Sequence, residues 1–134
     1  MNINSVRIGL ILLGIFHAAN GLFMLVAPDQ WYATVPGVPA TGPINDHFIM
    51  DIGWAFLASG AGLILGGGRG PRAATFAIAG AAFPTLHALM HVWEWIEHGL
   101  PQGGRLMLSE FVGVVGLSFL GAALAWLRNR QGDA

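Results

Sequence analysis

The sequence predicts an all-α protein, an integral membrane four-helix bundle with both termini in the cytoplasm. Of its 134 residues, 54% are apolar and only 10% are charged, whereas about 25% charged residues are usual in soluble domains. Four apolar runs are each long enough to cross a bilayer, which takes about 20 helical residues. The 20 glycines suit helices that pack closely in lipid, because small residues let backbones approach. The length favours a single domain over residues 1–134.

The predicted membrane-spanning helices follow the four apolar runs. They cover residues 6–27, 47–66, 73–98 and 106–127 approximately. The first run has Arg7 before it, as a signal peptide would, but its length and its internal His17 and Asn20 favour a retained helix. Pro84 lies inside the third helix, where it should free the carbonyl of Gly80 and kink the helix.

Residues 28–46 form a predicted external loop, because four prolines and two glycines prevent a continuous helix. Trp31 and Tyr32 are expected at the membrane–water boundary, and Asn45 or Asp46 is expected to cap the following helix. The arginines set the orientation. Five lie on one side and one on the other: Arg7, Arg69, Arg72, Arg128 and Arg130 against Arg105. The positive-inside rule then predicts a multi-pass protein with both termini in the cytoplasm and the loop outside.

Ionisable side chains are costly inside a membrane span, so we interpret those in this chain as a candidate site on its periplasmic side. On the third helix, His87, His91 and Glu94 recur at i, i+4 and i+7 and share one face. The full candidate set draws on all four helices: His17, His47, Asp51, His87, His91, Glu94 and Glu110. Counting about 1.5 Å per residue from the outer helix ends places all of them in the outer half of the bilayer. The sequence therefore predicts that they meet.

Four imidazoles and three carboxylates predict a dinuclear centre for a divalent transition metal, namely iron, zinc or copper. These metals accept imidazole, and carboxylates bridge two ions. The chain has no cysteine, which excludes thiolate ligands. His91 with Glu94, and His47 with Asp51, have the spacing of chelating pairs in helix bundles. Such a centre would suit an oxidoreductase or hydrolase acting on a small or lipophilic substrate.

Two other functions stay open. Two of His17, His87 and His91 could ligate a b-type haem in an electron-transfer protein, although a haem pocket gains nothing from three carboxylates. The buried His and Glu side chains could instead perform cofactor-free acid–base chemistry on a lipid-like substrate. Each residue also has a purely structural interpretation, such as a core histidine bonded to the backbone. A net charge of -1 excludes nucleic acid as a partner, which leaves the lipid bilayer and a second copy of the chain.

The whole chain resembles the small four-helix bacterial inner-membrane proteins grouped as DoxX-like. The resemblance lies in its size, in the end of the first helix, and in the loop that leads into the second. The two stretches are Gly21-Leu-Phe-Met-Leu-Val-Ala-Pro28 and His47-Phe-Ile-Met-Asp51-Ile-Gly53. The resemblance implies a membrane redox accessory linked to quinones, and it assigns no role to the histidine and carboxylate set.

Overall fold

A computed structural model describes residues 2–131 and consists of helices and their connections. The first three spans are α1 (Ile3–Val26), α3 (Asp46–Gly66) and α4 (Ala73–His98). The fourth span, Gly104–Gln131, is built from α5 (Gly104–Leu108), a π-helical segment η2 (Ser109–Gly116) and α6 (Leu117–Gln131). All four spans are long and apolar enough to cross a membrane. The predicted all-α multi-pass architecture is therefore confirmed.

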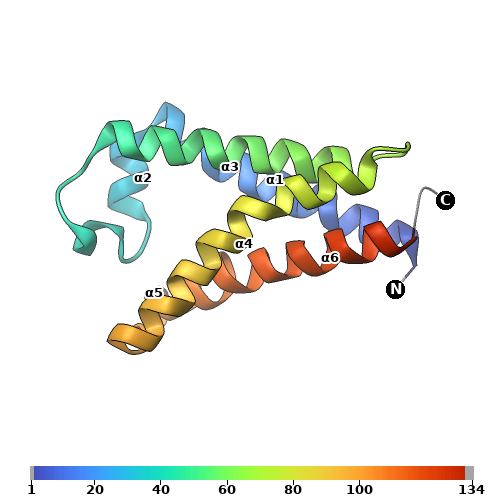
Figure 1. Cartoon of the computed structure of the whole chain (residues 1–134). Coiled ribbons are helices and arrows are strands. Elements are labelled where there is room, and N and C mark those ends of the chain that lie inside the picture. The colour runs from blue at the N-terminus through green and yellow to red at the C-terminus, as the bar shows by residue number, and fades with distance from the viewer. Residues whose placement is uncertain (1, 132–134) are drawn as a thin grey trace.

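The four spans run up and down and close into a bundle. Helix α1 packs against α3 and α6, and α4 packs against α3 and α6. Figure 1 shows the beginning of α1 and the end of α6 at one end of the bundle, with α2 and α5 at the other. We call these the terminal end and the loop end. Pro84 lies inside α4, and Figure 1 shows this helix bending away from α3 toward α5, as the sequence predicts.

Side-chain caps and glycines set the helix ends. Oδ1 of Asn2 accepts the backbone N–H of Ser5 at 2.9 Å, so α1 begins at Ile3, before the predicted start. Oδ1 of Asn45 accepts the N–H of Phe48 at 3.1 Å, which confirms one of the two predicted caps of α3. At the end of α4, Gly99 has a φ of 88°, a conformation that favours glycine.

The connection between α1 and α3 is ordered by two short helices. These are α2 (Pro28–Thr34) and the 3-10 turn η1 (Val38–Thr41). The indole N–H of Trp31 donates to Oδ1 of Asn20 on α1 at 3.0 Å. The hydroxyl of Tyr32 donates to the carbonyl of Gly42 at 2.5 Å. The two aromatic residues therefore bind this segment to α1 and to itself.

Glycines let α1 and α3 approach backbone to backbone. A methyl group on Gly21 would lie 2.5 Å from the carbonyl oxygen of Gly53, and one on Gly60 would lie 2.6 Å from that of Gly14. Large apolar side chains such as Leu12 point outward instead. An exposed apolar surface around a close-packed interior is the pattern expected of helices in lipid.

Candidate functional site at the loop end

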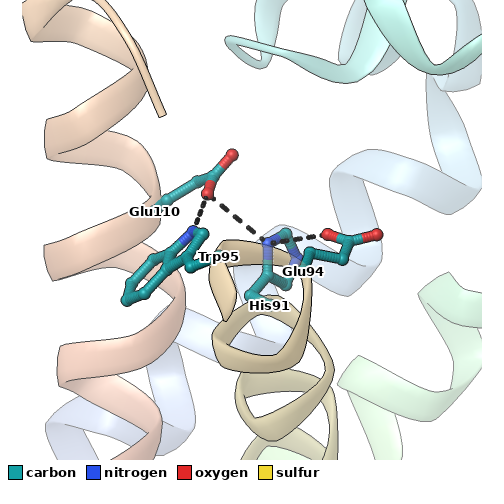
Figure 2. A network of polar contacts seen from close by, with 4 residues as sticks. All are labelled: His91, Glu94, Trp95 and Glu110. Carbon is teal, nitrogen blue, oxygen red and sulfur yellow. Dashed lines mark hydrogen bonds and ion pairs between the residues drawn. The ribbon is translucent and has the colours of Figure 1, made fainter. Parts of the chain in front are cut away.

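His91, Glu94 and Glu110 form a polar cluster at the loop end, which we call the acidic histidine cluster. Nδ1 of His91 lies 3.8 Å from Oε2 of Glu94 and 3.7 Å from Oε2 of Glu110. The imidazole lies between the two carboxylates (Figure 2). These distances exceed a hydrogen bond, and the buried Nδ1 atom has no hydrogen-bond partner. Three groups able to bind a cation thus converge from two spans.

Trp95 holds Glu110 in place. Its indole N–H donates to Oε2 of Glu110 at 2.6 Å, the same oxygen that faces His91 (Figure 2). Its ring stacks on Phe111 at a centroid distance of 4.3 Å. Glu110 and Phe111 both lie in η2, the π-helical segment of the fourth span, and both contact Trp95 of α4. This segment thus orients one carboxylate of the cluster.

The two deeper histidines pack in an aromatic layer. His17 of α1 stacks on Phe56 of α3 with centroids 5.7 Å apart, and His87 of α4 meets the edge of the same ring at 5.7 Å. His87 also stacks on Phe83 and lies 4.9 Å from the ring of His91. His17 is 2% exposed, and neither of its ring nitrogens has a hydrogen-bond partner. The imidazoles therefore extend from the acidic histidine cluster into the bundle, with Phe56 contacting both His17 and His87.

His47 and Asp51 form a separate pair on α3. Nε2 of His47 lies 3.6 Å from Oδ2 of Asp51, and the two side chains are 91% and 62% exposed. Within residues 2–131, no hydrogen bond or ion pair joins them to His91, Glu94 or Glu110. The structure thus brings three of the predicted site residues together, places His17 and His87 behind them, and leaves this pair on the surface.

The segment between α1 and α3 reaches the acidic histidine cluster beside Glu110. A methyl group on Gly37 would lie 2.7 Å from Cδ1 of Leu106 and 4.0 Å from Oε1 of Glu110. Gly37 has a φ of 89°, which other residues adopt with strain. A glycine at this point therefore lets the segment turn sharply and touch the fourth span beside Glu110.

Sequence reasoning placed Trp95 near the polar residues but gave it no role in holding Glu110, and it missed Phe56 and Gly37. The role of Trp95 could have been found, because it lies four residues after His91 and so shares its helix face. Phe56 and Gly37 reach the site through tertiary packing, for which the sequence carries no local signal.

No family model matches the chain, and neither the curated proteins nor the solved structures contain a match. The resemblance to DoxX-like proteins therefore stays a prediction. Across residues 2–131, no group of three or more His, Asp or Glu side chains is already arranged to hold a metal ion. Because no known protein suggests a function, the geometry of the acidic histidine cluster is the basis for proposing one.

Proposed function

We propose that this protein binds one divalent transition metal ion in the membrane, between His91, Glu94 and Glu110. The observation that carries the proposal is the buried Nδ1 of His91, which has no hydrogen-bond partner and faces carboxylate oxygens at 3.7 and 3.8 Å. Two carboxylates that face one imidazole nitrogen supply negative charge and oxygen donors for a cation. Iron, zinc and copper all accept this combination of imidazole and carboxylate.

The separations of the His91 nitrogen from the two carboxylate oxygens are close to what an ion needs. Zinc bonds of roughly 2.0–2.2 Å in tetrahedral geometry place neighbouring donors about 3.4 Å apart. The observed separations of 3.7 and 3.8 Å need to shrink by a few tenths of an ångström. Glu94 is 54% exposed and can make this adjustment, whereas Glu110 is fixed by Trp95. An oriented carboxylate beside an adjustable one favours ion capture.

The arrangement favours one ion over two. A dinuclear centre would need further ligands beside the acidic histidine cluster, but His47 and Asp51 pair with each other on the surface. His87 contributes a neighbouring imidazole, 4.9 Å from His91 between ring centroids. Its ring also packs against Phe83 and Phe56. The aromatic packing of His17 and His87 also fills the space that a porphyrin would need between them, which weighs against haem.

A bound ion of this kind would polarise water or dioxygen. The site lies beside exposed apolar surface, including Trp93 and Ile96, so we propose a small or lipophilic substrate that arrives through the bilayer. The resemblance to DoxX-like proteins suggests a bacterial inner membrane, and the arginine distribution supports an orientation with the terminal end in the cytoplasm and the site toward the periplasm.

A second candidate function is acid–base chemistry without a metal. Protonated His91 would itself supply the positive charge between the two carboxylates, and the 2.6 Å hydrogen bond from Trp95 holds Glu110 beside it. This cluster could then exchange protons with a lipophilic substrate.

Elemental analysis of the full chain, purified in detergent without chelators, tests the proposal. We expect about one transition-metal ion per chain in the wild type, and at least a tenfold lower content in His91→Ala and Glu94→Ala. His47→Ala is the matched control, because it removes an exposed imidazole outside the cluster, and it should keep the ion. Metal-free wild type, or equal loss in His47→Ala, would exclude the metal site.

The same samples separate the alternatives. A Soret band in the visible spectrum would indicate haem. If the protein holds no metal, infrared spectra across pH would report the carboxylates directly. A carboxylate band that shifts with pH in the wild type and not in His91→Ala would then support the acid–base function.

A further inference from the structure

A groove runs along the outer surface between α4 and α6, away from the acidic histidine cluster. Its volume is about 490 Å³, and small side chains make up much of its wall. These include Ala81, Ala82, Ala122 and Ala125. Thr85 in the groove already donates its hydroxyl to the carbonyl of Ala81 at 2.7 Å. The wall therefore presents mainly apolar surface, and its part-buried hydroxyl is already satisfied, which suits a hydrocarbon occupant.

The groove has the length and position of one acyl chain in one leaflet. Along α4 it extends from Ile78 to Leu86, which is about 12 Å at 1.5 Å per residue. Half of a bilayer's hydrocarbon thickness is about 15 Å. Its other wall ends at Asn129, close to the last residue of α6 and so to the terminal end. A chain lying in it would therefore have its headgroup at the terminal end.

The side chain of Arg130 lies where that headgroup would be. The guanidinium of Arg130 lies 4.9 Å above the ring of Trp126, which lines the groove. Arg130 is exposed, and a guanidinium on an aromatic face still offers its in-plane N–H groups to a phosphate. Trp126 is 55% exposed, as expected of an indole at the boundary between lipid and water.

Acidic side chains would compete for this cation, but those of the described chain lie elsewhere. Within residues 2–131 they belong to α2, the start of α3, the end of α4 and η2, all at the loop end: Asp29, Asp46, Asp51, Glu94, Glu97 and Glu110. Among residues 2–131, the charge at the groove is thus complementary to an anion.

We propose that this groove is a binding site for an anionic phospholipid, with one acyl chain between α4 and α6 and its phosphate at Arg130. The site is separate from the proposed metal site and does not depend on it. A lipid bound there would contact both α4 and α6 near the terminal end.

Lipid retention by the full-length protein tests this site. The protein is reconstituted in nanodiscs containing equal amounts of phosphatidylglycerol and phosphatidylethanolamine with identical acyl chains. It is then extracted, and the retained lipids are counted by native mass spectrometry. We expect the wild type to retain phosphatidylglycerol preferentially, and Arg130→Gln to lower this preference about fivefold, since one interfacial cation is worth about that factor. Arg105→Gln removes an exposed arginine at the loop end and should leave the preference unchanged.

A second pair of variants tests the groove itself. Ala82 is an exposed residue of the groove wall, so Ala82→Phe should fill it and abolish the retained phosphatidylglycerol. Ala79→Phe places the same side chain on an exposed position of α4 outside the groove wall and should retain the lipid. Equal retention of both lipids by the wild type would overturn the proposal. So would equal effects of Arg130→Gln and Arg105→Gln, or of the two phenylalanine variants, with folding verified by size-exclusion chromatography.

Discussion

At the scale of single residues, Trp95 determines how rigid the candidate site is. Its ring is fixed by stacking on Phe111 at 4.3 Å, and its N–H holds Glu110 at 2.6 Å. A donor that orients a ligating carboxylate commonly contributes a factor of 10–100 to metal affinity. Trp95 therefore couples the aromatic packing of η2 to the position of Glu110, one of the proposed ligands.

We predict that Trp95→Phe lowers metal affinity at least tenfold while the protein stays folded, because phenylalanine keeps the ring contact and removes the hydrogen bond. Trp93→Phe is the matched control, since Trp93 is 61% exposed and should not change affinity. Competition with a fluorescent chelator would measure both. Equal affinities in the two variants would show that the hydrogen bond from Trp95 to Glu110 does not support metal binding.

At the scale of elements, the approach of α1 and α3 depends on glycines that face one another. Gly60 lies against the backbone of Ala18 and Gly14, at distances of 2.5 and 2.6 Å for an added methyl group. Gly121 of α6 has room instead, with Leu13 at 3.7 Å from an added methyl.

We predict that Gly60→Ala lowers the free energy of unfolding by about 1–3 kcal/mol, because the added methyl forces the two backbones apart. Gly121→Ala should be neutral, since its methyl makes an ordinary contact. Denaturation in mixed detergent micelles would measure both variants. A loss of stability in Gly121→Ala as large as in Gly60→Ala would show that backbone approach is not the cause.

The elements also show why the site was only partly predictable. The sequence gives the depth of His47 and Asp51 through the rise per residue, but rotation about the helix axis depends on neighbouring helices. Gly53 and Gly60 mark the face of α3 that packs against α1. Asp51 stands two residues before Gly53, about 200° around the helix, and so points outward. The glycine stripe was therefore the available signal for its direction.

The four spans, by contrast, could be read from the sequence because hydrophobic length is a local property that the bilayer fixes. The π-helical segment was not predicted. It changes the rotation of Glu110 relative to α6, and the wide turn of Ser109–Gly116 has no recognised local sequence pattern. His91 and Glu94 were correctly grouped with Glu110 because the first two share a helix face and all three lie near the same end.

At the scale of the whole molecule, the even number of spans places both ends of the described chain on one side (Figure 1). Which side faces the cytoplasm follows from the arginines as a prediction. The chain has no cysteine, so single introduced thiols can report the orientation without background.

We predict that Thr41→Cys in inner-membrane vesicles of native orientation reacts with a membrane-impermeant maleimide from the periplasmic side only. Pro71→Cys, in the turn between α3 and α4, should react only from the cytoplasmic side. Both positions are exposed, and the two residues lie at opposite ends of the bundle. If Thr41→Cys reacted only from the cytoplasmic side and Pro71→Cys only from the periplasmic side, the proposed topology would be wrong. The candidate site would then face the cytoplasm.

The contact of Gly37 with Leu106 also has a consequence for biogenesis. Gly37 precedes the second span, whereas Leu106 belongs to the last one, and a chain is synthesised from its N-terminus. The segment that covers Glu110 therefore cannot dock until translation of the fourth span is under way. Loading of the proposed ion would accordingly be a late event in maturation, and a nascent chain truncated before α5 would be unable to complete it.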